Sequence, residues 1–329
     1  MFKIGVFGAG HLGKIHIRCL LQSEYYQLVG FYEPNAETGA RVAAELGVTH
    51  YTDADALYDA VEVIDIVTPT VAHYAVARAA LLRDKHVFIE KPVTETVAQG
   101  EELLQLAAQR GLQVAVGHVE RFNPAFLALQ GQHIAPRFIE AHRLATFNPR
   151  GTDVSVVLDL MIHDLDIVLH LVNSPVKQVQ ATGVSIVSST ADIANARIEF
   201  ENGAVANLTA SRISIKQMRK VRLFQPDAYI SLDFLDKKTE IIRIFDESQA
   251  ANLVKDSLMQ LDTANGTKYL SMSLPEPPAV NAILTELNEL AIAIETQTNP
   301  PVTLQDGLNA LRIALEIEAQ IENNNCINN

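Results

Sequence analysis

Short apolar stretches alternate with amphipathic ones through the first 120 residues. The apolar stretches are rich in β-branched residues, as strands buried on both faces are, and they lie at 3–8, 27–33, 63–70, 86–92 and 113–118. The segments between them, such as 36–47 and 97–111, repeat apolar residues at helical spacing. This alternation predicts a parallel sheet with helices on both faces.

The pattern changes after about residue 176. Apolar and polar residues now alternate along 178–186, 195–214, 220–234 and 239–245, and Asn202-Gly203 is a strong hairpin-turn signal. These stretches predict an open antiparallel sheet. The expected fold class is α/β, with a doubly wound Rossmann domain at 1–120 and a C-terminal α/β domain at 121–329.

Between the two regions, apolar positions persist from 153 to 172. This segment predicts one mostly buried helix that joins the domains. Two further helical patterns follow residue 278 and are separated by paired prolines at 300–301, which cannot continue a helix.

The composition narrows the class of protein. The 329 residues suffice for about two domains, and 48% hydrophobic with 20% charged residues is typical of a soluble globular chain. A net charge of −13 argues against binding to nucleic acid or an anionic membrane, although a locally basic pocket for a small anion stays compatible. Two cysteines, Cys19 and Cys326, support neither a disulfide framework nor a zinc ribbon. With no signal-peptide pattern and no apolar run of about 18 residues, a cytoplasmic location is expected.

The residues Gly8-Ala9-Gly10-His11-Leu12-Gly13 form a dinucleotide-binding signature. They follow a predicted strand and open a predicted helix, and Glu33 stands 20 residues after Gly13, at the end of the next strand. The first glycine makes a tight turn, the second lets a pyrophosphate approach, and the third lets helix and strand pack. Glu33 would accept hydrogen bonds from ribose hydroxyls and repel a 2′-phosphate, which favours NAD over NADP. The alternative is a glycine-rich turn beside a surface acid.

Lys91 follows a predicted buried strand, at the sheet edge where open α/β sheets bind ligands. Its ammonium could donate to a substrate hydroxyl and to the cofactor ribose, with Glu90 holding it and Pro92 stiffening the turn through a cis bond. The alternative is a surface Glu-Lys pair before a helix-starting proline.

Asp159 and His163 are four residues apart, so a helix carries them on one face. Removal of hydride from a carbinol needs a base for the hydroxyl proton, and a histidine can take it near neutral pH while the carboxylate orients the ring. A satisfied buried polar pair is the alternative. Asp166 and His170 extend the pair to a stripe that resembles a metal site, but no cysteine or further histidine completes a ligand set, so no metal is predicted.

The ordered set of motifs resembles the Gfo/Idh/MocA family of oxidoreductases over nearly the whole chain. The stretches that carry the resemblance are VFGAGHLGKIH (6–16), VTPTVAH (67–73), FIEKPVTET (88–96), VGHVERFNPA (116–125), LDLMIHDLDI (158–167) and PPVTLQDGLNALRIALEI (300–317). The resemblance implies an N-terminal NAD(P)-binding Rossmann domain. It also implies a C-terminal domain for substrate and oligomerisation, whose open antiparallel sheet often forms the interface of a homodimer or homotetramer.

By the same resemblance, Lys91 is the lysine that contacts the nicotinamide ribose and the substrate. Asp159 and His163 match the D-x-x-x-H pair of the family, in which the histidine is the usual acid/base of sugar and cyclitol dehydrogenases. The loop that passes beside the cofactor is matched by Thr68, Pro69 and His73.

The chain departs from many members of the family around the D-x-x-x-H pair. It carries Val156, Val157 and Met161 where glycines are common, and bulkier groups there would reshape the substrate pocket. Within the family the chain most resembles the bacterial branch that contains UDP-N-acetylglucosamine 3-dehydrogenases. Five basic residues could meet the diphosphate of a nucleotide sugar, or form the solvated face of a strand pair; they are Arg212, Lys216, Arg219, Lys220 and Arg222.

The sequence therefore predicts an NAD-dependent dehydrogenase that oxidises a ring hydroxyl of a sugar or nucleotide sugar, with the 3-hydroxyl of UDP-N-acetylglucosamine as one candidate. His163 would take the proton, Asp159 would position it, and Lys91 would stabilise the developing alkoxide. Cyclitols, dihydrodiols and linear tetrapyrroles are alternative substrates. Two further alternatives are an NAD-dependent glycoside hydrolase and a non-catalytic NAD-linked regulator, the latter disfavoured because a sensor needs no proton path.

Overall fold

The chain forms two compact units. The computed structural model describes residues 1–148, 154–250, 258–264 and 266–327, and the side chains of 325–327, Cys326 included, lie outside the described part. Unit 1 comprises Met1–Phe122 and Asn281–Arg312, and unit 2 comprises Asn123–Val280 and Ile313–Asn329.

Residues 281–312 belong to unit 1, although the predicted second domain, 121–329, includes them. They contain helix α9 (Ala282–Thr296), whose Leu287 and Leu290 are fully buried in the same core as strand β1 (Phe2–Phe7). Burial of this apolar face returns the chain to unit 1, which the helical pattern alone does not reveal because it does not show against what the face packs.

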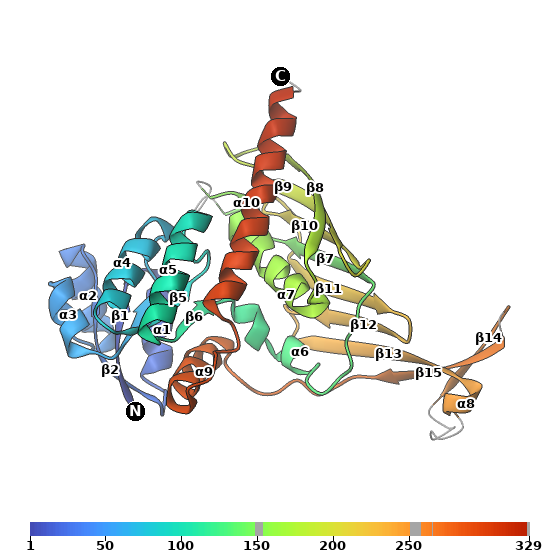
Figure 1. The fold of residues 1–329 in the computed structure, drawn as a ribbon, viewed down its shortest axis with the longest axis horizontal. Coiled ribbons are helices and arrows are strands. Elements are labelled where there is room, and N and C mark those ends of the chain that lie inside the picture. Colours follow the sequence, from blue (N-terminus) through green and yellow to red (C-terminus); the bar gives the residue numbers. More distant parts are fainter. Residues whose placement is uncertain (149–153, 251–257, 265, 328–329) are drawn as a thin grey trace. The chain divides into compact units, whose positions relative to one another are not determined.

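Unit 1 is built on a six-stranded parallel sheet with the order β3-β2-β1-β4-β5-β6. This is the strand order of a doubly wound dinucleotide-binding fold, so the predicted Rossmann architecture is confirmed. Figure 1 shows these strands in blue to green. They are β1 (Phe2–Phe7), β2 (Tyr26–Tyr32), β3 (His50–Tyr51), β4 (Val63–Ile66), β5 (His86–Glu90) and β6 (Val114–Gly117).

The helices of unit 1 follow the predicted amphipathic segments. Several of them begin at side-chain caps. In two of these, Asn35 accepts from the Thr38 N–H and Thr96 accepts from the Gln99 N–H, and both helices end at a left-handed glycine. The helices are α1 (His11–Leu20), α2 (Ala36–Leu46), α3 (Ala54–Ala60), α4 (Thr70–Leu82), α5 (Val97–Arg110), the short η1 (Val119–Phe122) and α9. Helix α10 (Leu304–Ile327) begins in unit 1 and continues into unit 2.

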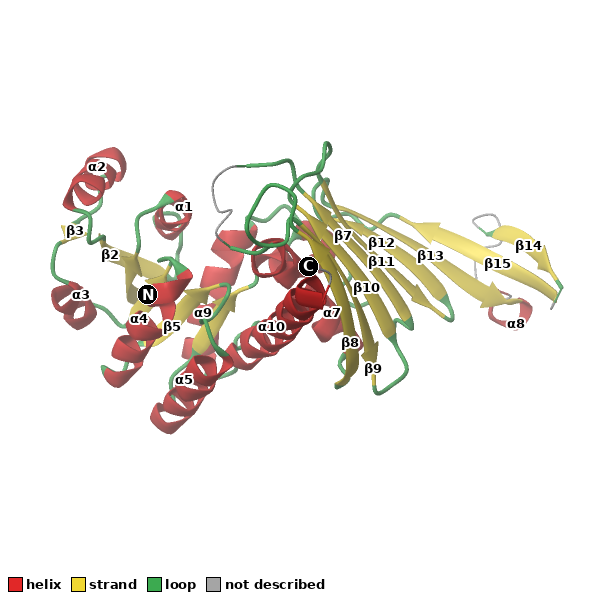
Figure 2. Ribbon diagram, turned by 90° about the horizontal axis from the view of Figure 1, so that it is seen from above, coloured by secondary structure: helices red, strands yellow, loops and turns green. Residues whose placement is uncertain are grey.

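Unit 2 is built on a nine-stranded sheet with the order β14-β15-β13-β12-β11-β7-β10-β9-β8, drawn in yellow in Figure 2. Neighbouring strands are antiparallel except for β7 and β10, which are parallel because the chain crosses over through a helix and two strands between them. The strands are β7 (Phe138–Leu144), β8 (Val176–Val184), β9 (Ile193–Phe200), β10 (Val205–Ser211), β11 (Met218–Gln225), β12 (Ala228–Asp233), β13 (Lys238–Asp246), β14 (Met259–Thr263) and β15 (Gly266–Ser273). The predicted antiparallel sheet is confirmed with that one exception, and β14 and β15 add an exposed edge that the sequence pattern does not predict.

The predicted single helix from 153 to 172 begins instead with a π-helical turn, η2 (Val157–Met161), and continues as α7 (Ile162–Val172). The Ile162 N–H bonds to the Val157 carbonyl, which inserts one extra residue into the turn. Residue 153 of this segment lies outside the described part. Two short helices, α6 (Pro124–Leu127) and α8 (Glu247–Ala250), complete unit 2. In the described chain, no helix combines the length and the apolar character that a membrane span needs.

Candidate active site

The glycine-rich loop joins β1 to α1 at the carboxyl edge of the unit 1 sheet. Gly8 has a φ of +99°, and a Cβ there would lie 2.7 Å from the carbonyl oxygen of Val67. A Cβ at Gly13 would overlap the Gly8 carbonyl oxygen, so loop and helix pack with no room for a side chain. At Gly10, in contrast, nothing lies within 4 Å of the position that a Cβ would take.

The start of α1 suits an anionic ligand. Gly10 is its N-cap, and no side chain caps the first N–H groups of the helix. Such N–H groups, together with the helix dipole, favour a phosphate. Gly10 is flanked in the sequence by Ala9, His11 and Leu12. The open space beside Gly10 fits the close approach of a dinucleotide pyrophosphate to the backbone.

Glu33 directly follows β2 and is held beside the glycine loop. One carboxylate oxygen accepts from the Ala9 N–H at 3.0 Å and the other accepts from the Asn35 N–H at 3.1 Å. In this fold the acid after the second strand meets the adenosine ribose. The preference for NAD over NADP stays a prediction, which rests on the negative charge of Glu33 at this position.

His73 ties together two of the loops at the same sheet edge. Thr68 and Pro69 follow β4, Pro69 is the N-cap of α4, and His73 lies in the next turn. The His73 Nε2 is 2.9 Å from the Thr68 carbonyl oxygen, and Nδ1 is 2.8 Å from that of Pro92. Burial lowers the pKa of His73 in spite of these carbonyls, so a neutral ring donates to one of them at a time.

Lys91 follows the last residue of β5, at the carboxyl edge of the sheet, as the sequence predicts. The peptide bond between Lys91 and Pro92 is cis. Glu90 Oε2 accepts from the backbone N–H of Lys91 at 3.2 Å, so the contact from Glu90 holds the main chain at this turn. The carboxyl edge of unit 1 thus gathers the glycine loop, Glu33, Thr68, Pro69, His73, Glu90 and Lys91.

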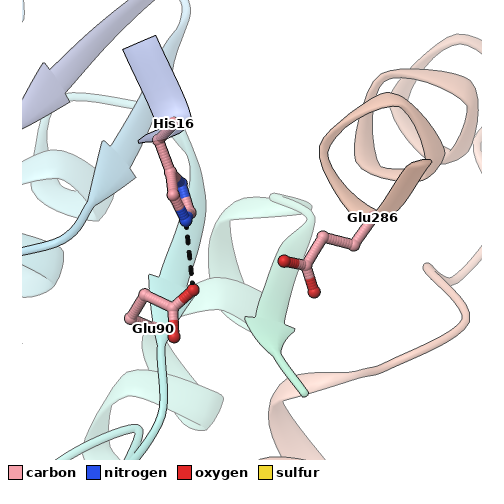
Figure 3. A group of neighbouring side chains, drawn as sticks. All are labelled: His16, Glu90 and Glu286. Atoms are coloured by element: carbon pink, nitrogen blue, oxygen red, sulfur yellow. Dashed lines mark ion pairs between the residues drawn. The ribbon is translucent and has the colours of Figure 1, made fainter. Parts of the chain in front are cut away.

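Three further side chains, which the sequence motifs do not single out, lie around Glu90. His16 of α1, Asp65 of β4 and Glu286 of α9 are buried there, and Figure 3 shows His16 and Glu286 on two sides of Glu90. A signal in the sequence points to one of them, because Asp65 interrupts an otherwise apolar buried strand.

Asp159 and His163 lie in unit 2. Asp159 belongs to the π-helical turn and His163 to the first turn of α7, and both are partly exposed. Next to His163, the carboxylate of Asp164 accepts from Arg143 of β7 through Nη2 at 2.8 Å and through Nε at 3.2 Å. This buried pair, which the sequence pattern does not reveal, fixes the first turn of α7 to the sheet.

The stripe that Asp159, His163, Asp166 and His170 form does not gather a set of metal ligands. Among the described residues, the group of three potential ligands that come close together is His16, Glu90 and Glu286. These three belong to unit 1, and none of them is in the stripe.

The basic run in unit 2 is largely engaged by its own sheet. Lys220 pairs with Asp233 on the adjacent strand, and Arg222 pairs with Glu140. Arg212 is buried and donates to the carbonyl of Val154. These contacts fit a solvated strand surface better than a free diphosphate site.

Comparison with protein families gives two adjoining matches. Residues 2–118 match the oxidoreductase family with an NAD-binding Rossmann fold, and residues 127–227 match the GFO/IDH/MocA C-terminal domain. The first match covers the sheet edge described above, and the second covers the π turn and α7.

Individual proteins agree with this assignment. The chain is 43% identical over 240 residues to UDP-N-acetylglucosamine 3-dehydrogenase of Acidithiobacillus ferrooxidans, which is 73% of this chain and 76% of that protein. A solved structure of that enzyme has a TM-score of 0.87 at 35% identity and covers 98% of both chains. A scyllo-inositol dehydrogenase of Lactobacillus casei with bound NAD(H) and scyllo-inositol shares the fold, with a TM-score of 0.76 at 21% identity over 98% of both chains.

Proposed function

The chain belongs to the GFO/IDH/MocA oxidoreductases, and on that premise we propose that it is an NAD-dependent dehydrogenase of a nucleotide sugar. The proposed substrate is UDP-N-acetylglucosamine, oxidised at its 3-hydroxyl. The observation that carries this proposal is the similarity to the Acidithiobacillus ferrooxidans enzyme over about three quarters of both chains. Lys91, Asp159 and His163 supply the side chains that the chemistry needs.

NAD, when bound, accepts the hydride from the carbon that carries the hydroxyl. The chain's own part begins with the glycine loop, which receives the pyrophosphate at Gly10 and the start of α1. Glu33 receives the adenosine ribose and disfavours the 2′-phosphate of NADP, which is the basis for proposing NAD.

Three side chains handle the substrate in the proposed reaction. The Lys91 ammonium donates to the substrate hydroxyl and stabilises negative charge on its oxygen as the proton leaves. His163 takes that proton, since an imidazole can act as a base near neutral pH. Asp159 orients the ring of His163 or binds the sugar.

The decisive experiment measures NADH formation with UDP-N-acetylglucosamine and identifies the product by mass spectrometry. A product lighter by two hydrogens, with the new carbonyl at carbon 3, is expected. UDP-glucose, free N-acetylglucosamine and scyllo-inositol are the comparison substrates. Faster oxidation of scyllo-inositol would replace the nucleotide sugar by a cyclitol, and glycoside cleavage without net NADH would replace the dehydrogenase by a hydrolase.

A matched variant tests the role of Lys91. Lys91→Ala is expected to lower kcat by about 100-fold or more while the Kd for NAD changes little, because the ammonium acts on the reacting oxygen. Lys85→Ala, at a partly exposed position of the same unit, is the control. An unchanged kcat in Lys91→Ala would remove this lysine from the chemistry.

Two broader features complete the proposal. Self-association as a homodimer or homotetramer would use the sheet of unit 2. In β7, β9 and β10 up to Ala210, every second residue is buried and the residues between them are partly or fully exposed. A cytoplasmic location fits the free thiol of Cys19.

A further inference from the structure

Four ionisable side chains are buried together at the base of the turn that carries Lys91. His16 and Asp65 are 0% exposed, Glu286 is 2% exposed and Glu90 is 7% exposed. They come from α1, β4, α9 and β5, so segments from both ends of the chain build the cluster. Figure 3 shows Glu286 pointing from its helix toward Glu90 and His16.

His16 lies between two carboxylates. Its Nδ1 is 3.0 Å from Asp65 Oδ2, and its Nε2 is 3.2 Å from Glu90 Oε1. A carboxylate oxygen only accepts hydrogen bonds, so a ring that faces one on each side is best served by two N–H groups, which is the imidazolium form. Burial by itself would lower the pKa of His16, but Asp65 and Glu90 together raise it well above its ordinary value.

Glu286 is in a different situation. No donor in the described chain hydrogen-bonds directly to either carboxyl oxygen of Glu286. One of these oxygens nevertheless lies within 4.8 Å of a ring nitrogen of His16 and of a carboxylate oxygen of Glu90. Three carboxylates and one imidazolium would leave two uncompensated negative charges in the protein interior, which is strongly unfavourable. Burial and the negative charge of Glu90 raise the pKa of Glu286 well above its ordinary value, so Glu286 is the group that keeps its proton.

Glu90 connects the buried cluster to the turn that carries Lys91. While Oε1 faces His16, Oε2 accepts from the backbone N–H of Lys91. On a further side, a Cβ at Gly117 would lie 2.7 Å from Glu90 Oε1, so the glycine leaves just enough room for the carboxylate. The main chain of Lys91 is therefore attached to a side chain that cannot move without breaking a buried ion pair.

We propose that His16 is a positioning residue that acts on Lys91 through Glu90, within a buried cluster whose net charge falls from −2 to −1 when Glu286 carries a proton. This inference rests on the proposed function for the consequence in catalysis, but not for the charge states. His16 holds the Glu90 carboxylate in the orientation that accepts from the Lys91 N–H, so the side chain of Lys91 extends from a backbone that is held in place. Reacting groups displaced by about 1 Å lose about 100-fold in rate, so this attachment matters for turnover.

Other titratable groups also face the cluster. Cys19 on α1 and Tyr26 on β2 are buried near it, and burial raises the pKa of both, so both stay neutral at physiological pH. Burial raises the pKa of Asp65 as well, while His16 opposes that rise. Glu120 and Arg121 lie on η1, which packs on α9.

The charge states are tested first, on the unmodified protein and without any substrate. Nitrogen NMR of the histidine side chains should show His16 doubly protonated at neutral pH, above the ordinary histidine pKa of about 6.5. Metal analysis by mass spectrometry should find no ion in stoichiometric amount. A neutral His16 ring at neutral pH would overturn the proposal, and so would a bound metal, because Glu286 would then be an ionised ligand.

Kinetics tests the positioning role. With saturating NAD, His16→Gln is expected to lower kcat at least about tenfold while the Kd for NAD changes less than about threefold. The double variant His16→Gln with Glu90→Gln, which leaves no unpaired charge at Glu90, should recover part of that kcat. Glu286→Gln, which keeps a neutral group of the same shape, should lower kcat less than Glu286→Leu does. Glu289→Gln on the same helix is the matched control.

The outcomes separate this inference from the proposed function. A wild-type protein that oxidises no nucleotide sugar would defeat the proposed substrate, yet the NMR result would still decide the charge states. A His16→Gln variant that loses NAD binding and kcat in equal measure would reduce His16 to a structural residue. An unchanged kcat in that variant would also remove the positioning role.

Discussion

Replacement of Gly10 by alanine should separate cofactor binding from folding. The backbone at Gly10 has a φ of −68°, which alanine adopts freely, and no atom lies within 4 Å of the new Cβ. Loss of a glycine N-cap costs a few tenths of a kcal/mol, up to about 1. Removal of glycine from the unfolded chain contributes about 0.4–1 kcal/mol in the opposite direction. The free energy of unfolding without cofactor should therefore change by less than about 1 kcal/mol.

The same methyl group should weaken cofactor binding. It would occupy the place where the pyrophosphate approaches the backbone, and crowding a packed contact costs about 1–3 kcal/mol. That corresponds to an increase in Kd of about 5- to 150-fold. The chain has no tryptophan, so the fluorescence of NADH itself is the suitable signal, with thermal unfolding of the cofactor-free protein measured beside it.

Gly13→Ala is the comparison variant. Its Cβ would overlap the Gly8 carbonyl oxygen, so this variant should lower both the Tm of the cofactor-free protein and the affinity for NADH. An unchanged Kd in Gly10→Ala would refute the reasoning, because the pyrophosphate would then not approach Gly10. Equal losses of Tm in the two variants would refute it as well.

Three more predictions concern other parts of the two units. Glu33→Gln keeps an acceptor for the Ala9 N–H but removes the charge, so it should shift the ratio of kcat/KM for NAD over NADP at least about tenfold toward NADP, measured with both cofactors. Arg143→Met removes the guanidinium that donates to the buried Asp164 carboxylate, which should cost about 3–5 kcal/mol in chemical denaturation; the double variant with Asp164→Leu should recover much of it, and a small loss in the single variant would contradict the importance of this ion pair. Because folding raises the pKa of Glu286, its stabilising contribution is complete below the ordinary glutamate pKa of about 4.3 and is lost as pH rises through the folded pKa. Glu286→Gln does not titrate, so its Tm relative to wild type should increase as pH rises above the ordinary glutamate pKa of about 4.3, and a constant difference would argue against a proton on Glu286.

The Rossmann half could be predicted because its signals are local. The glycine loop, the strand before it and Glu33 lie within the first 33 residues, and each has a backbone or charge requirement that only a few residue types meet. The position of Lys91 at the end of β5 follows in the same way from an apolar run that stops at a charged pair. The catalytic roles of Lys91, Asp159 and His163 stay predictions.

The remaining features depend on contacts that sequence periodicity does not carry. His16 meets Asp65 across 49 residues, and Glu286 reaches Glu90 from a helix near the other end of the chain. A lone acid in the strand of Asp65 indicates that some partner exists, but not which one. The π turn around Asp159 differs from an α-helix by a single inserted residue, and helix propensities do not distinguish these two kinds of turn.

Unit 1 is built from two separate stretches of the chain, so it cannot finish folding until the ribosome has made the second stretch. The first 122 residues leave the exit tunnel with a gap where α9 belongs, and the core around Leu287 stays incomplete until residues 281–312 have been made. Until then His16, Asp65 and Glu90 lack the fourth member of their cluster, because Glu286 lies on α9. The Rossmann unit is thus not a detachable module, and a gene fragment ending at residue 122 should yield an aggregation-prone product rather than a miniature NAD-binding protein.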